Sequence, residues 1–260
     1  IELSQVKGNY STALNWALKK IDTDYVALTD ADCVVSKNWI DRLLSGFDEK
    51  GVIATAGWCG TPEGLTGFQK AIGLELESRF RRFPRYILRA PTMNLCMKTD
   101  IARQVGFDEK IQVGIETDFG YRLTKLGKMK YIPEAKVWHY HRTSVYAYFK
   151  QKRDQASGAV RTYLKHKDKI KGDHISTPMM MLQVPLSGLI ITGTLLWFLY
   201  KPALYLAHIG LLILLVIYVL DLFKTTKQIK YYPPLLLVFV TRTIAWLTGC
   251  IIGIFKLCKL

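Results

Sequence analysis

Cysteine is scarce in this 260-residue sequence. It holds five cysteines, an odd number, scattered between Cys33 and Cys258 without a C-x-x-C pair. This distribution excludes a disulfide framework and a cysteine-based zinc site, and it favours a reducing compartment. The N-terminus shows neither an initiator methionine nor the basic and apolar regions of a signal peptide. We therefore expect the sequence to be truncated at its N-terminus.

Acidic residues are nearly absent from the last third. Residues 175–260 contain one carboxylate, Asp221, against seven Lys and Arg, and the whole chain has a net charge of +15. Such a basic balance suits nucleic acid, an anionic membrane surface or phosphorylated substrates. Because long apolar runs accompany the charge, we expect membrane lipids and a phosphorylated ligand as partners, and no nucleic acid.

Three apolar segments lie near the C-terminus, at about 179–200, 203–220 and 235–255. About 20 residues at roughly 1.5 Å per residue cross a hydrocarbon core of about 30 Å. The sequence therefore predicts an N-terminal domain over residues 1–172, followed by a membrane domain over 173–260 with about three transmembrane helices.

Charges near these segments indicate a multi-pass protein of the cell membrane and cell envelope. Lysines before the first segment and after the second share one side, which the positive-inside rule makes cytoplasmic, together with the N-terminal domain. Lys256 and Lys259 would lie outside if the third segment also crossed, and Arg242 lies within it. A re-entrant or interfacial third segment therefore stays open.

The N-terminal half of the chain alternates between helical and strand patterns. Helical spacing covers 11–21, 36–47, 65–89, 100–105 and 117–126, and strand patterns cover 25–28, 52–56, 91–97, 130–132 and 136–139. Ser11 or Thr12 is expected to cap the first helix. This alternation predicts an α/β domain with a largely parallel sheet.

The first strand ends in two carboxylates, Asp30 and Asp32. Side chains alternate in extended chain, so both point the same way. Hard oxygen ligands at the carboxyl end of a strand suit Mg²⁺ or Mn²⁺ shared with substrate phosphates. A solvated turn explains the same pair equally well.

Two further groups fit such a site. Glu116 lies where the helix over 117–126 begins, and the helix dipole there favours a negative charge that can accept a proton. A purely capping acid is the alternative. His139 shares a strand face with His141, so one of them is a candidate metal ligand or phosphate contact, although most single histidines are structural.

Five motifs in order resemble those of membrane-anchored family 2 glycosyltransferases of the GT-A fold. They are Lys7-Gly8 with Ala13-Leu14-Asn15, Asp30-Ala31-Asp32, Thr92-Met93-Asn94, Gly106-Phe107-Asp108-Glu109 and Gly114–Leu123. Trp39 falls where that family has a helical tryptophan, and Gln151 with Arg153 resembles part of the Q-x-x-R-W motif of processive synthases. The resemblance therefore extends over most of the predicted N-terminal domain and implies that residues 1–172 are a catalytic domain.

The resemblance implies a GT-A domain, Rossmann-like with a mostly parallel sheet and incomplete at its N-terminus. It implies a nucleotide-sugar donor, and roles for the following residues: metal binding for Asp32, Asp30 and His139, catalysis for Glu116 and Asp118, donor binding for Asp30, Lys7 and Asn15, and acceptor binding for Asn94, Gln151 and Arg153. The activity that the resemblance implies is metal-dependent transfer of a hexosyl group, with inversion at the anomeric carbon.

Three departures limit this inference. Glu replaces the family's Asp at position 116, the Q-x-x-R-W pattern is broken at Asp154 and Gln155, and the family's first strands are absent. We expect a lipid-linked glycan or polyprenyl phosphate as acceptor. The alternatives are a processive polysaccharide synthase, a metal-dependent phosphotransferase acting on a lipid phosphate, and a non-catalytic membrane subunit with a relic domain.

Overall fold

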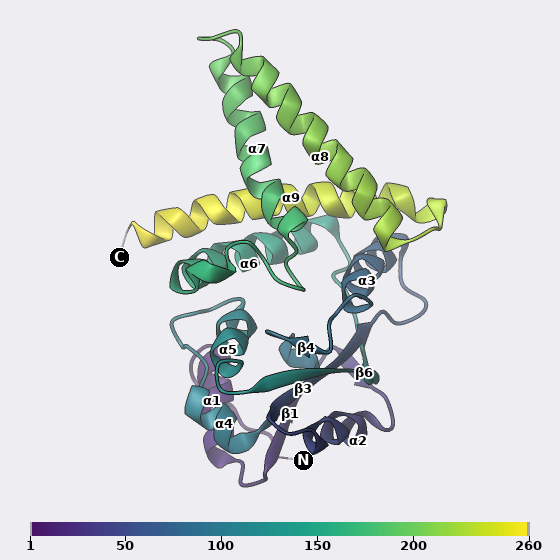
Figure 1. Cartoon of the computed structure of the whole chain (residues 1–260), viewed down its shortest axis with the longest axis vertical. Helices are drawn as coiled ribbons and strands as arrows, with labels where there is room; N and C mark the ends of the chain where they lie inside the picture. The colour runs from purple at the N-terminus through teal and green to yellow at the C-terminus, as the bar shows by residue number, and fades with distance from the viewer. Residues whose placement is uncertain (1, 259–260) are drawn as a thin grey trace. The chain divides into compact units, whose positions relative to one another are not determined.

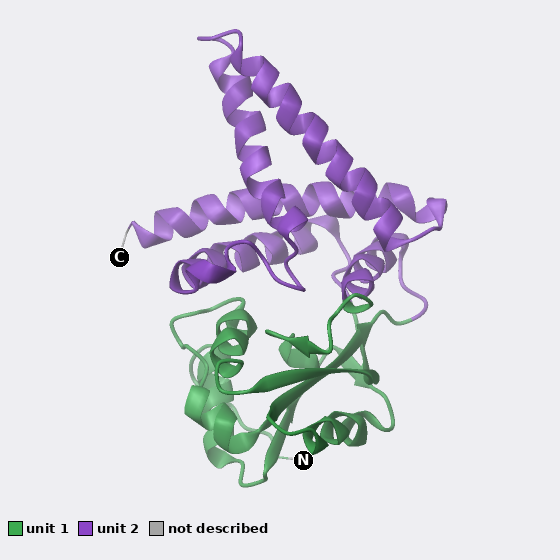
Figure 2. Ribbon diagram, viewed as in Figure 1, with its two compact units in different colours: residues 1–62, 80–140 green, residues 63–79, 141–260 purple. Residues whose placement is uncertain are grey.

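The computed structural model describes residues 2–258 (Figure 1). The chain divides into two compact units, and each is built from two stretches of sequence (Figure 2). The first unit runs to residue 62 and resumes over 80–140, and the second takes in 63–79 and the chain from 141 onward. The boundary at residue 172, expected between a catalytic domain and a membrane domain, stays a prediction.

The first unit is a six-stranded sheet with helices. Its strands are β1 (Tyr25–Leu28), β2 (Cys33–Val35), β3 (Val52–Gly60), β4 (Tyr86–Ile87), β5 (Leu95–Lys98) and β6 (Lys128–His139). Its helices are α1 (Tyr10–Lys20), α2 (Trp39–Leu44), α4 (Thr99–Val105) and α5 (Ile115–Leu123), with 3₁₀ turns at Ser45–Asp48 and Thr92–Asn94. The strand order is β1-β5-β3-β6-β2, and β4 pairs with β6.

The expectation of a largely parallel sheet is wrong for the described residues. Only β3 and β6 pair in parallel, whereas β5 runs antiparallel to β1 and to β3, and both β2 and β4 run antiparallel to β6. Strands β1, β3 and β6 do share one direction, and β5 inserts between β1 and β3 in reverse. Periodicity reports which residues face the core, but it does not report strand direction.

Local details also differ from the sequence-based expectations. The side chain of Asn9, and not Ser11 or Thr12, caps α1 by accepting from the Thr12 amide. The two short strands expected around Pro133 form the single strand β6. Its register against β3 shifts between the Gly57–Ile132 and Trp58–Lys136 pairs, so a bulge accommodates the missing proline donor.

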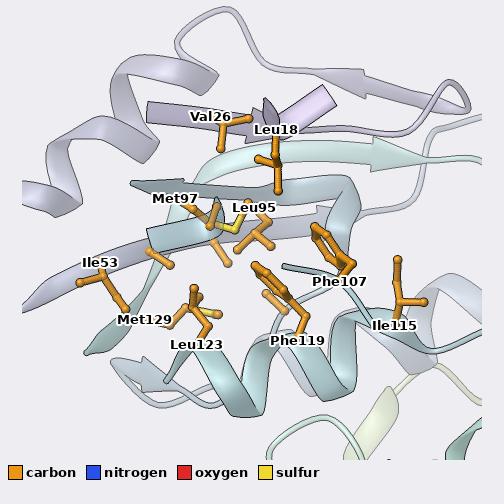
Figure 3. Close-up of a cluster of buried hydrophobic side chains, with 14 of the residues drawn as sticks. Leu18, Val26, Ile53, Leu95, Met97, Phe107, Ile115, Phe119, Leu123 and Met129 are labelled. Atoms are coloured by element: carbon orange, nitrogen blue, oxygen red, sulfur yellow. The ribbon is translucent and has the colours of Figure 1, made fainter. Parts of the chain in front are cut away.

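Buried side chains from α1, α4 and α5 pack on the sheet (Figure 3). Leu18, Val26 and Met97 belong to this cluster, and the rings of Phe107 and Phe119 stack with their centroids 4.1 Å apart. Apolar burial of this kind is the main favourable term in folding. It fixes α5 against the sheet and thereby positions the first turn of α5.

The second unit is helical. It contains most of α3 (Gly67–Phe80) together with α6 (Val145–Lys165), α7 (Pro178–Leu196), α8 (Ala203–Thr225) and α9 (Tyr232–Leu257). The helices at Pro178–Leu196, Ala203–Thr225 and Ile229–Leu257 are long and apolar enough to cross a membrane. They correspond to the three apolar segments read from the sequence.

A buried polar network joins the helices of this unit. The Arg242 guanidinium of α9 is 2.5 Å from the Glu75 carboxylate of α3, and it also donates to Gln183 Oε1 of α7 at 3.2 Å. Thr243 donates to the same Gln183 oxygen. Burial alone would raise the pKa of Glu75, but Arg79 and Arg242 together hold it below its ordinary value.

Candidate functional site

The two carboxylates that follow β1 line an open cavity. Asp30 and Asp32 lie on the turn between β1 and β2, and with Tyr10 and Ala31 they border a cavity of about 490 Å³. This volume lies within the range of small-ligand sites, about 300–1,000 Å³. Both acids predicted from the strand-end pattern therefore face one cavity.

The pairing of β2 with β6 brings His139 to Asp32. Cys33 is opposite His139 in this antiparallel ladder, and the Tyr140 amide donates to the Asp32 carbonyl oxygen at 3.2 Å. His139 Nε2 lies 3.5 Å from Asp32 Oδ2. Two of the predicted metal ligands, far apart in sequence, are thus neighbours.

Tyr10 is a member of this site that sequence reasoning missed. Tyr10 is the first residue of α1, and its hydroxyl donates to Asp30 Oδ1 at a distance of 3.3 Å. Burial, reinforced by the negative charge of Asp32, raises the pKa of Asp30, and the Tyr10 hydrogen bond and His139 only partly offset this. No local sequence pattern marks Tyr10, because its partner follows a different element of the fold.

Glu116 lies in the first turn of α5, after Gly114, whose φ of +77° suits glycine. Its charge reaches Tyr10: burial raises the pKa of the Tyr10 hydroxyl, and the negative charges of Asp30 and Glu116 raise it further. Glu116 and Asp30, predicted for different ends of a reaction, therefore act electrostatically on the same hydroxyl.

Asp118, predicted to be catalytic, lies in the first turn of α5. It is fully buried, and Arg122 Nε donates to it at 2.8 Å. The same guanidinium donates to the carbonyl oxygens of Val105 and Gly106. This arrangement ties the turn after α4 to α5, and the catalytic role of Asp118 stays a prediction.

Asn15, predicted to bind the donor, holds the same turn. Its amide donates to the Phe107 carbonyl and to Glu109 Oε1, both at 2.9 Å, and its oxygen accepts from the Phe107 amide at 2.7 Å. Hydrogen bonds from Asn15 and Thr12 lower the pKa of Glu109. Asn15 and Glu109 belong to two different motifs of the family resemblance, and this hydrogen bond joins the two motifs. Lys7 is exposed in the segment before α1.

Asn94, predicted to bind the acceptor, is fully buried. Its oxygen accepts from Trp39 Nε1 at 2.8 Å, and its amide donates to the carbonyl oxygens of Trp58 and Ala135, each at 2.9 Å. These bonds join α2, β3 and β6 through one side chain. They give Asn94 a structural role, and its contact with an acceptor stays a prediction.

Gln151 and Arg153 lie on α6, in the second unit. The guanidinium of Arg153 donates to Asp154 Oδ1 from both Nε, at 2.9 Å, and Nη2, at 2.7 Å. Asp154 is the residue at which the Q-x-x-R-W pattern breaks. Acceptor binding by Gln151 and Arg153 stays a prediction.

Asp32 and His139, with Asp30 beside them, are the groups suited to a divalent cation. Within residues 2–258, no three or more His, Cys, Asp and Glu side chains form a complete metal-binding cluster. Adjacent ligands on an octahedral ion with bonds of about 2.1 Å are about 3 Å apart, close to the 3.5 Å between Asp32 Oδ2 and His139 Nε2. Asp32 and His139, with Asp30 beside them, would therefore fit around such an ion.

The chain resembles known glycosyltransferases in sequence. Residues 1–111 match the family described as "Glycosyl transferase family 2". The pre-mycofactocin glycosyltransferases of two Mycobacterium tuberculosis strains are 26% identical over 186 residues, which cover 68% of this chain and 40% of each relative. The chain thus spans less than half the length of these curated relatives.

A solved structure shows the same fold. The mannosyltransferase PcManGT from Pyrobaculum calidifontis, in complex with GDP-Man and Mn²⁺, aligns with a TM-score of 0.55 and 13% identity over 98% of this chain and 69% of that one. The expected GT-A fold is thereby confirmed, with a mixed sheet in place of the mostly parallel one.

Charge at Asp30 is expected to cost stability. Because the pKa of Asp30 is raised in the folded state, the folded protein binds this proton more readily than the unfolded chain, and the ionised form destabilises the fold above that pKa. Asp30→Asn should raise the melting temperature at pH 7–8, by up to about 2 °C. Scanning fluorimetry of the detergent-purified chain should show the gain fading as the pH falls toward 4. The exposed acid Asp48 gives the control, Asp48→Asn, and an equal gain in both variants would contradict this assignment.

Removing Asn94 should destabilise the first unit. Asn94→Ala leaves the Trp39 indole N–H and two carbonyl oxygens without partners in a buried place, so we expect a loss of about 3 kcal/mol in unfolding free energy. Denaturant unfolding followed by tryptophan fluorescence measures it. Asn38→Ala is the matched control, since Asn38 is exposed and makes no side-chain cap. A loss no larger than that of the control would restore a ligand-binding role.

Proposed function

Since residues 1–111 match glycosyl transferase family 2, we propose that the protein transfers a hexosyl group from a nucleotide-sugar donor to a membrane-associated acceptor. The acceptor class is a lipid-linked glycan or a polyprenyl phosphate. One observation supports this most directly: Asp30, Asp32 and Tyr10 line one open cavity at the carboxyl end of β1, and His139 contacts Asp32.

At the donor end, the proposal assigns Asp32 and His139 to a divalent cation, Mn²⁺ or Mg²⁺. The cation would supply Lewis-acid neutralisation of the diphosphate as the sugar–phosphate bond breaks. Asp30, held by the Tyr10 hydroxyl, accepts a hydrogen bond from a ribose hydroxyl of the donor. The exposed Lys7 contributes a positive charge toward the donor phosphates.

At the acceptor end, Glu116 is the proposed general base. It takes the proton of an acceptor hydroxyl while that oxygen attacks the anomeric carbon opposite the leaving diphosphate, so the configuration inverts. A phosphate acceptor is already ionised at neutral pH and needs no such base. The sensitivity of the reaction to Glu116 therefore separates a hydroxyl acceptor from a polyprenyl phosphate. Gln151 and Arg153 remain the proposed acceptor contacts.

The proposed location is the cell membrane, with the first unit facing the cytoplasm. Three helices have the length and apolar composition of membrane spans. Basic residues flank them, while residues 175–260 hold a single acid. Anionic headgroups on the cytoplasmic leaflet attract such charges, and a membrane-bound acceptor would be presented there.

Asp32→Ala is expected to lower transfer at least about 100-fold, because it removes one proposed ligand of the cation that would neutralise the diphosphate. Transfer of radiolabel from a panel of nucleotide sugars to membrane lipid measures it, using the full chain in its membrane. EDTA should abolish wild-type transfer, and Mn²⁺ or Mg²⁺ should restore it. Asp48→Ala is the matched exposed control. Unchanged transfer by Asp32→Ala, or insensitivity to EDTA, would refute the metal assignment.

Glu116→Gln is expected to lower transfer to a hydroxyl acceptor by about 10²–10⁴-fold with little effect on donor binding, because it removes the base alone. The same labelled panel and a nucleotide-binding titration measure the two effects. Glu63→Gln, at an exposed glutamate, is the control. No transfer by the wild-type chain from any donor, and no binding of Mn²⁺ or nucleotide, would favour a non-catalytic membrane subunit.

A further inference from the structure

Helix α9 has two chemically different faces. Its exposed large hydrophobic side chains, each at least 38% accessible, form what we call the apolar stripe: Leu236, Leu237, Val240, Ile244, Ile251, Ile254 and Phe255. At about 100° per residue these positions fall within about one third of the helix circumference. Arg242 lies on the opposite side and is 2% exposed.

The face opposite the stripe packs on helices that carry charge. In the first half of α9, Arg242 pairs with Glu75 of α3. In the second half, Gly249 and Gly253 lie so close to α6 that a Cβ atom at either would meet α6 backbone, at the Arg153 and Ser157 carbonyl oxygens. The two glycines therefore allow α9 to run directly along α6 (Figure 1).

These contacts conflict with a membrane-crossing α9. Helix α6 carries Lys150, Lys152, Arg153, Asp154, Arg161 and Lys165, and these side chains are exposed or half-buried. If α9 crossed a bilayer, α6 beside it and the Arg242–Glu75 pair near its middle would enter hydrocarbon. Each charge at that depth is unfavourable, because hydrocarbon cannot solvate it. Length and apolar composition suit a span, but the neighbours of α9 do not.

Cations flank the stripe at both ends. Lys227 and Lys230 precede α9, Lys256 lies in its last turn, and all three are exposed. Tyr231 and Tyr232 stand at its start, where amphipathic rings favour a membrane interface. A helix lying flat would place these cations at one headgroup level, where anionic lipid attracts them.

We propose that α9 lies in the plane of the membrane, with its apolar stripe among the acyl chains of anionic lipids and its opposite face on α3 and α6. Helices α7 and α8 extend from the other side of α9 within this unit (Figure 1) and remain the crossing pair. Their exposed surfaces are also apolar, so the stripe continues the lipid-facing surface of the hairpin. Lipid, rather than a second protein copy, is the occupant because lysines border the stripe at both ends.

The depth of two stripe positions tests this arrangement. Spin labels at Leu237→Cys and Ile251→Cys would differ in depth by about 21 Å on a crossing helix, given the rise of about 1.5 Å per residue. In the proposed arrangement their depths agree closely. Leu182→Cys and Leu196→Cys on α7 have the same spacing and similar exposure, and they give the spread that a crossing helix produces. Power saturation of the full chain in anionic vesicles, in a background with the native cysteines replaced, measures all four.

A depth difference for the α9 pair as large as that for the α7 pair would overturn the proposal. Spin labels on α9 could instead be shielded from oxygen dissolved in the lipid, with spectra broadened by the label of a neighbouring chain. That result would also overturn the proposal, in favour of a second copy of the chain covering the stripe. An independent measurement leaves the native cysteines intact: tags at the N- and C-termini of the full chain are tested with antibodies in sealed and opened vesicles. Two crossing helices place both tags on one side, and tags on opposite sides would contradict an in-plane α9.

Discussion

Pairing along β6 is the constraint on which the first unit depends. This strand is hydrogen-bonded to β3, β2 and β4, so the register of three strands is set by their pairing with β6. Its carboxyl end supplies His139 next to Asp32, and the Ala135 carbonyl accepts from Asn94 further back along it. The register of one strand therefore determines both the packing of α2 and the contact between His139 and Asp32.

Acidic side chains in this unit divide into two physical classes. Asp118 and Glu109 are held by cations or amide donors, and their charges stabilise the turn that follows α4. Asp30 and Asp32 lie close together with limited compensation, and burial and mutual repulsion disfavour the charge on Asp30. Strain of this second kind is typical of functional sites, because a ligand can relieve it.

Sequence patterns located most elements, and they located the residues whose chemistry is local. The Asp-x-Asp pair, the helix bearing Glu116 and the three apolar segments were predicted from spacing alone. Strand direction was not, because alternation does not encode it. The structural placement of Asn15, Asn94 and Asp118 was also hidden, since each depends on partners distant in sequence or on burial. A motif shared with a family marks a residue that matters, but it does not say whether the residue meets ligand or holds the fold.

The chain leaves the first unit to form α3 and then returns to it, so this protein cannot easily be divided into fragments. Residues 63–79 belong to the second unit although sheet strands precede and follow them. Cleavage after residue 172 would retain α3 while removing Arg242, leaving the buried Glu75 without one of its two cations and exposing the apolar residues that pack against α9. The two units are therefore interleaved in sequence, and a single cut in the polypeptide cannot yield either unit with its packing complete.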